Sequence, residues 1–173
     1  MDLAATLAIL RRTPAAVSAL LVGLPEVLLS ADEGPETFSP RDVVGHLIYG
    51  EETDWVPRIR IILEHGESRP FSPFDRTGFR TAVAGRPIAE LAGRFAALRR
   101  SNLEYVNGLE LDDPVRLALR GTHPALGPVT LGALLSSWAV HDLGHLTQIS
   151  RVLAKRWRDD VGPWREYLTI LDR

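Results

Sequence analysis

Apolar residues recur along this chain mainly at intervals of three and four positions, which is the spacing of an amphipathic helix. Four long segments carry this pattern, at residues 1–24, 39–65, 87–109 and 130–156. Evidence for strands is scarce, because only residues 114–121, "PVRLALRG", alternate weakly and are expected to pair locally at most. The pattern predicts an all-α protein, an antiparallel four-helix bundle with long connecting loops and a short C-terminal helix.

Prolines and capping residues mark the expected helix ends. Thr13 and Pro14 resemble an N-cap followed by a proline at the first helical position, so we expect the first helix to restart or bend there. The pair at 39–40, Ser-Pro, opens the second helix in the same way, and Gly66 ends it. Pro57 lies inside this helix and is expected to kink it or to loosen one turn. The stretch "PWREYLTIL" predicts a short closing helix.

Two connections are long, at about residues 66–86 and 110–129, in a chain read as one domain over residues 1–173. Loops of this length in a compact domain are usually functional or mobile. The first contains three phenylalanines and an aspartate, which suit an apolar pocket wall with a polar anchor. The alternative is that these phenylalanines only hold the loop against the bundle. The residues concerned are Phe71, Phe74, Asp75 and Phe79.

Composition limits the function classes. Hydrophobic residues make up 45% and charged residues 24% of the chain, as in soluble globular proteins. A net charge of −2 gives no electrostatic case for nucleic-acid binding. We expect no membrane span, because no run of about 18 apolar residues occurs, and the N-terminus lacks the pattern of a secretory signal. The absence of cysteine excludes disulfides and cysteine ligands and fits the cytoplasm, where we expect the protein.

The candidate chemistry lies in "WAVHDLGHLTQIS", which places His141 and His145 one helical turn apart on an apolar face. Buried imidazoles need hydrogen-bond partners or a metal, and a catalytic zinc ion typically takes three protein ligands. The third ligand must come from elsewhere in the chain. His46 is preferred because a facing helix positions a donor better than a loop does. His123 lies in a loop, and His65 has the alternative role of a cationic helix C-cap.

His46 lies away from the main apolar stripe of its helix, beside small residues such as Gly50 and Thr53. Small neighbours leave room for a metal and a substrate, but the same position is also compatible with a histidine that faces water. A further alternative is three buried structural histidines without a metal. The stripe itself runs through Val44, Ile48, Trp55, Ile59 and Ile62.

Two segments resemble a known family. "SPRDVVGHLIYGEETDW" followed far downstream by "TLGALLSSWAVHDLGHLTQISRVL" resembles the DinB-like (YfiT-type) superfamily, over about residues 5–155. The resemblance implies a four-helix bundle, commonly a homodimer. It also implies a metal held by one histidine of the second helix and a His-x-x-x-His pair of the last long helix, here His46, His141 and His145. Three histidines suit zinc or nickel.

The activity implied by the resemblance is less specific than the fold. Characterised relatives include metal-dependent S-transferases that use thiols such as bacillithiol or mycothiol, a mycothiol-dependent isomerase and proteins assigned as hydrolases. We expect a metal-dependent enzyme that transfers a low-molecular-weight thiol to a small electrophilic substrate, or hydrolyses such a substrate. The alternative is a non-catalytic metal-binding or structural dimeric bundle of the stress-response type.

Four polar residues are candidates to orient the metal ligands or to line the pocket: Glu51, Asp142, Gln148 and Tyr49. Gln148 lies one turn beyond His145 on nearly the same helix face. The alternative for Glu51 is a buried pair with an arginine of a neighbouring helix, and for Asp142 a contact on the helix surface. The alternative for Tyr49 is a half-buried ring with its hydroxyl in solvent.

Overall fold

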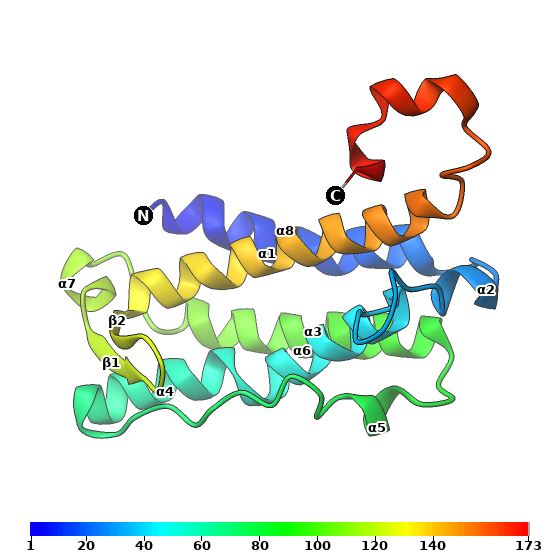
Figure 1. The fold of residues 1–173 in the computed structure, drawn as a ribbon. Helices are drawn as coiled ribbons and strands as arrows, with labels where there is room; N and C mark the ends of the chain where they lie inside the picture. Colours follow the sequence, from blue (N-terminus) through cyan, green and yellow to red (C-terminus); the bar gives the residue numbers. More distant parts are fainter. Residues whose placement is uncertain (173) are drawn as a thin grey trace.

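The long helices lie side by side, and each contacts two neighbours around a common core (Figure 1). In the computed structural model, which describes residues 1–172, α1 contacts α6 and α8. On the opposite side, α3 contacts the same two helices, and α4 continues α3 along α8. This arrangement is the predicted four-helix bundle. The four long helices are α1 (Leu3–Leu21), α3 (Pro40–Thr53) with its continuation α4 (Trp55–His65) counted as one rod, α6 (Ile88–Asn107) and α8 (Leu131–Lys155).

Short elements connect the long helices. The predicted third and fourth helices correspond to α6 and α8, and Thr130 caps α8 by accepting a hydrogen bond from the backbone of Ala133 at 3.1 Å. The short elements are α2 (Glu26–Leu29), η1 (Gly66–Ser68), α5 (Arg80–Val83), α7 (Pro114–Leu117), β1 (Arg120–His123), β2 (Gly127–Thr130), η2 (Gly162–Tyr167) and η3 (Thr169–Leu171).

The expected restart of the first helix at Thr13 and Pro14 is wrong, because α1 runs through both residues from its N-cap Asp2. Proline has no N–H to give to the carbonyl four residues earlier, which is that of Leu10. The guanidinium of Arg99 on α6 donates to this carbonyl instead, at 2.8 Å. A side chain from another helix therefore replaces the hydrogen bond that Pro14 cannot make.

The second predicted helix begins and ends as expected but breaks earlier. Ser39 and Asp42 form a capping box at its start, and Gly66, with a φ of +58°, ends it. The irregularity expected at Pro57 lies three residues earlier, at Asp54, where φ is −115° and ψ is −70° and one turn is loosened. Pro57 offers no N–H to the carbonyl of the turn before it, so the irregular turn lies on the N-terminal side of the proline.

The weak strand pattern at residues 114–121 is only partly right. Asp113 caps a helical turn that has Pro114 at its first position, so the segment begins as α7. Local pairing does occur beyond it, where β1 and β2 form an antiparallel hairpin from Arg120 opposite Thr130. The closing helix predicted in "PWREYLTIL" is also different, because the chain there forms two 3-10 turns, η2 and η3.

The apolar faces predicted for α8 and for the α3–α4 rod form the core. Burying each aliphatic side chain contributes roughly 1.5–3 kcal/mol. The buried residues of these two faces include Leu131, Leu134, Trp138, Ile149 and Val152, and Val44, Ile48, Trp55, Ile59 and Ile62.

Helix α1 is apolar enough to bear on the expectation that the chain has no membrane span. Its 18-residue window has a mean hydropathy of 1.2, so by length and composition alone it could cross a membrane. A core helix meets the same criterion, and although only 28% of this window is buried, Leu10, Val17 and Leu21 are fully buried against the other helices. This composition therefore does not identify α1 as a membrane helix.

Candidate metal centre

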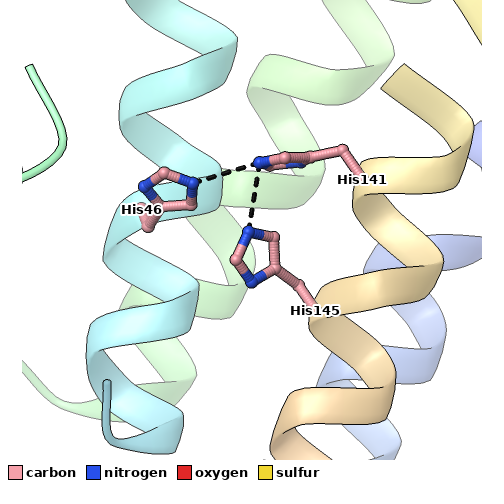
Figure 2. Close-up of side chains that lie close together, drawn as sticks. All are labelled: His46, His141 and His145. Atoms are coloured by element: carbon pink, nitrogen blue, oxygen red, sulfur yellow. Dashed lines mark hydrogen bonds between the residues drawn. The ribbon is translucent and has the colours of Figure 1, made fainter. Parts of the chain in front are cut away.

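Three histidines from two helices meet inside the bundle (Figure 2). The Nε2 atom of His141 lies 3.1 Å from that of His46 and 3.1 Å from that of His145. His46 comes from α3, and the other two come from successive turns of α8. The structure thus brings together the three histidines that the sequence singled out, and we refer to them as the histidine triad.

The triad is neutral at neutral pH. Burial, together with the neighbouring histidines, lowers the pKa of His46 to about 4 and that of His141 to about 3. Burial also lowers the pKa of His145, against the opposing effect of its hydrogen bond to Gln148. A neutral imidazole keeps the lone pair that binds a metal ion, so all three side chains are in the form that a metal requires.

Gln148 fixes the orientation of His145, as predicted for a residue one turn beyond it. Its amide oxygen Oε1 lies 2.9 Å from Nδ1 of His145. Because an amide oxygen only accepts hydrogen bonds, Nδ1 carries the proton and the Nε2 lone pair points to the centre of the triad. The Nδ1 atoms of His46 and His141 are sealed from solvent and have no hydrogen-bond partner among the described residues.

The three nitrogens fit a divalent ion. Two ligands that each lie about 2.0–2.1 Å from a tetrahedral ion are about 3.3–3.4 Å apart. The two separations at His141, 3.1 Å each, are close to this value, and all three ligand atoms lie within 4.8 Å of one another. Without an ion, Nε2 of His141 has only one proton or one lone pair to share in hydrogen bonds with two neighbouring nitrogens, so one of the two contacts is left without a proper hydrogen bond. The donor set therefore suits zinc or a similar ion with one coordination position left for another ligand.

The triad lines a cavity of about 870 Å³ that lies between α3, α4, α8 and the connecting loops. Its walls combine aromatic and proline side chains with charged groups, as in sites for small organic molecules. Trp55 forms the wall nearest the triad, since its ring centroid lies 5.2 Å from that of His141. The other apolar wall residues include Phe38, Pro73, Phe74 and Pro124.

The long loop at residues 66–86 contributes less to the cavity than predicted. Phe74 does line it and packs on the ring of His46. Phe71 and Phe79 are buried in the core instead, which matches the alternative that they hold the loop against the bundle. Asp75 is exposed and accepts hydrogen bonds from Thr77, so it caps a turn of the loop and is not a polar anchor in the cavity.

A buried ionic network lies next to the triad and joins all four long helices. All five N–H groups of Arg99 are used, because it donates twice to Glu51, twice to Asp142 and once to the carbonyl of Leu10. Glu51 also accepts hydrogen bonds from Asn102 and from the indole of Trp138. We refer to Arg99, Glu51 and Asp142 with these partners as the Arg99 network.

This network decides two of the candidate roles. Glu51 forms the buried pair with an arginine that was the alternative to a role at the metal, and burial raises its pKa although Arg99 lowers it. Asp142 does not make the helix-surface contact considered for it, because its side chain is fully buried against Arg99. Neither carboxylate forms a hydrogen bond to the triad among the described residues. Sequence reasoning missed Arg99 itself.

The remaining candidates lie outside the triad. Tyr49 is half-buried and packs on Phe74, outside the residues that line the cavity. His65 ends α4 and contacts Arg69. His123 lines the cavity from the hairpin, but its Nδ1 accepts hydrogen bonds from the backbone of two following residues. Neither of the alternative third histidines belongs to the cluster.

A buried ion pair in the cavity wall also escaped the sequence analysis. Arg58 lies 2.7 Å from Asp54, through Nε and Oδ1, and both side chains are nearly inaccessible to solvent. Burial raises the pKa of Asp54, and Arg58 opposes this effect. The pair lies at the break between α3 and α4, and both of its charged groups line the cavity.

Comparison of the fold finds a similar solved structure. YfiT from Bacillus subtilis, described as a probable metal-dependent hydrolase with an unusual four-helix bundle topology, matches with a TM-score of 0.76. The match covers 90% of this chain and 87% of that one. The sequences are 15% identical, so this likeness shows the fold alone.

Comparison of the sequence gives the family. No curated protein matches the chain. A model of the DinB superfamily, however, matches residues 9–149. This segment contains all four long helices of the bundle, apart from the two ends, and all three histidines of the triad. A match over most of the chain, in agreement with the fold, shows that the protein belongs to the DinB superfamily.

Proposed function

We propose that the protein is a divalent-metal-dependent enzyme whose ligands are His46, His141 and His145. The observation that carries the proposal is the convergence of three neutral Nε2 atoms at the wall of a cavity large enough for a small organic substrate. The solved relative YfiT, described as a probable metal-dependent hydrolase, supports the same reading. Zinc and nickel are the ions that the three imidazoles suit best.

The ion would supply Lewis acidity and would lower the pKa of a water or thiol that binds in its open position. Hydrolysis of a small electrophilic substrate and transfer of a low-molecular-weight thiol are the two reactions that this chemistry serves. The chain has no cysteine, so a thiol would have to come from a cosubstrate. Gln148 would hold His145 in the ligating tautomer. Trp55 and Phe74 would keep water away from the reacting groups.

A non-catalytic metal-binding bundle is the competing function. A structural metal site is normally closed by four protein ligands, whereas three donors meet here and the cavity adjoins them. This difference favours catalysis.

We also propose a cytoplasmic homodimer without nucleic-acid or membrane partners, on the family resemblance and composition alone.

Elemental analysis of tag-free protein tests the metal. We expect about one divalent ion per chain in the parent, loss of the ion in His46→Ala and in His141→Ala, and retention in the control His65→Ala, whose histidine lies outside the triad. Absence of metal from the parent after reconstitution would overturn the proposal. Metal-loaded protein is then assayed with thiol plus electrophile and with ester and amide panels. Turnover that needs a thiol separates transfer from hydrolysis.

A further inference from the structure

The cavity contains a second polar region, centred on Arg58 of α4. This side chain is 9% exposed, and its guanidinium stacks over the ring of Phe71 at 5.2 Å. Its ion pair with Asp54 is made through Nε, and its two terminal nitrogens donate no hydrogen bond to any described residue. The only side-chain atoms of the described residues that are sealed from solvent and also lack a hydrogen-bond partner belong to two histidines, so these unpaired nitrogens are not sealed. They therefore open on the cavity that Arg58 lines.

His123 of the hairpin supplies a second donor to this region. Its Nδ1 accepts hydrogen bonds from two backbone N–H groups, both at 3.1 Å, so Nε2 carries the proton. The ring lies against Phe71, with centroids 6.4 Å apart, on the same phenylalanine that supports Arg58. Burial and the charge of Arg58 lower the pKa of His123 and keep the ring neutral. The Nε2–H group is thus available to an acceptor in the cavity.

We propose that Arg58 and His123 bind a carboxylate group of the substrate, while the reacting end of the same molecule lies at the histidine triad. This inference rests on the proposed function for its second half only. The two terminal nitrogens of an arginine form a planar fork that matches the two oxygens of a carboxylate. Asp54 comes closest to Arg58 at Nε, and no described residue accepts a hydrogen bond from the terminal nitrogens, so the fork remains free.

The place of Arg58 on α4 separates the carboxylate site from the triad. Trp55 contacts the triad at His141, and Arg58 follows it by three residues, about 4.5 Å further along α4. A molecule that reaches both ends therefore needs several atoms between its reacting group and its carboxylate. Trp55 and Phe74 flank the space between, which suits an apolar middle part. The substrate class is a carboxylate on an extended, largely apolar chain.

Two other arginines line the cavity but are less suited to this role. Arg151 already forms a bidentate pair with Glu33, at 2.8 and 2.6 Å. Arg76 is exposed on the long loop, where water competes for an anion. Arg58 combines burial with free donors, and burial strengthens a charge-assisted hydrogen bond. Arg76 therefore becomes the alternative that the experiment must separate.

Binding of hexanoate and hexanol to metal-free protein, followed by calorimetry, tests the carboxylate site by itself. We expect hexanoate to bind about tenfold tighter than hexanol or better, because charged hydrogen bonds distinguish the two. Arg58→Gln should abolish the preference, and Arg60→Gln, which alters the arginine stacked on Tyr105, should not. Arg58→Gln leaves the buried Asp54 without its cationic partner, so the double variant Arg58→Gln/Asp54→Asn is measured as well. The single variant Asp54→Asn should tighten hexanoate binding, because it removes a negative charge beside the carboxylate site.

A preference for hexanoate over hexanol that survives in the double variant, or that is lost in Arg76→Gln instead, would overturn the assignment. Inorganic phosphate that binds more tightly than hexanoate would overturn it as well. A separate titration of cobalt-substituted protein with mercaptohexanoate and mercaptohexanol follows thiolate absorption at the triad. Carboxylate discrimination without thiolate absorption would contradict the thiol branch of the proposed function and leave the carboxylate site standing. The reverse pattern would contradict the carboxylate site alone.

Discussion

Replacing Arg99 by methionine removes the charge at the centre of the buried network and keeps most of the side-chain volume. In the parent, the guanidinium gives four hydrogen bonds to two carboxylates whose side chains are 0% exposed, Glu51 and Asp142. In the variant, both carboxylates stay buried without their counter-charge. The Leu10 carbonyl, which cannot accept a hydrogen bond from Pro14, also loses the hydrogen bond from Arg99.

The expected loss of stability is large. Removing one partner of a buried ion pair costs about 3–5 kcal/mol, because the remaining charge is desolvated and unpaired. Glu51 keeps its hydrogen bonds from Asn102 and Trp138, which limits the loss. Since domains are stable by only about 5–15 kcal/mol, the variant should lose a large share of its free energy of unfolding. The exposed neighbour Arg100→Met should change it by less than about 0.5 kcal/mol.

Urea unfolding at neutral pH measures the effect, since urea does not screen charges as guanidinium chloride does. The neutral variant Glu51→Gln/Arg99→Met/Asp142→Asn should recover most of the loss, because no unpaired charge remains. The pKa of Glu51 is already raised by burial, and removing Arg99 should raise it further. A raised pKa means that the folded state holds the proton more tightly, so the deficit of Arg99→Met should shrink as pH falls toward 4.5.

Two results would refute this reasoning. A loss below about 1 kcal/mol in Arg99→Met would show that the carboxylates find other partners or water. A neutral variant as unstable as the single variant would show that packing around Arg99, and not its charge, carries the stability.

Three further predictions concern single side chains. Gln148→Leu should weaken zinc binding by about 10–100-fold, measured against a chelating dye, because it removes the acceptor at Nδ1 of His145. Glu33→Gln should cost about 1 kcal/mol above pH 4.5 and almost nothing below pH 2. Hydrogen bonds and charges of its cationic partners lower the Glu33 pKa from 4.5 to about 2, so its stabilisation is lost as pH falls from 4.5 through the folded-state pKa. In thermal unfolding, Gly45→Ala should lower the free energy of unfolding by about 1–3 kcal/mol, because its Cβ would lie 2.5 Å from an α5 methyl group. The control Gly93→Ala, whose Cβ would meet open space, should raise it by about 0.5–1 kcal/mol. A stabilised Gly45→Ala, unchanged zinc affinity or a pH-independent Glu33→Gln effect would each contradict the corresponding contact.

The parts of the fold that follow from local spacing were predictable. Apolar residues at helical intervals place the four long helices, and the i, i+4 spacing of His141 and His145 places both on one face of α8. The third member of the triad was a choice among three histidines, made because a helix fixes a side chain better than a loop does. His46 indeed meets the pair, although it lies off the main apolar stripe of α3.

The parts that depend on contacts between distant segments were missed. The restart expected at Pro14 fails because the carbonyl it leaves free is satisfied by Arg99, which is 89 residues away from Leu10. The donors of Arg58 that open on the cavity follow from the helix break at Asp54, which periodicity does not reveal. The long-range hydrogen bond leaves no pattern in the residues beside it, whereas Pro57 marks the helix break only to within about one turn.

One signal for the Arg99 network was nevertheless present in the sequence. Arg99 continues the buried stripe of α6, four residues after Phe95 and four before Leu103. Asp142 follows the buried Trp138 by four residues on α8, and Glu51 lies between two buried positions of α3 and α4. A charged residue on an apolar face must be paired. One cation and two anions, each on the buried face of a different rod, are what such a pairing requires.

The positions of these charges connect the stability of the bundle to the geometry of the candidate site. Glu51 lies five residues after His46 on α3, and Asp142 directly follows His141 on α8. Arg99 binds both carboxylates, so it fixes the spacing and rotation of the two helices that carry the triad. Any sliding of α3 against α8 that separated the Nε2 atoms would also stretch buried charge-assisted hydrogen bonds, which cost several kcal/mol to lose. Hydrophobic packing alone tolerates small shifts of this kind, whereas a metal centre requires its ligands to be held within about 0.5 Å.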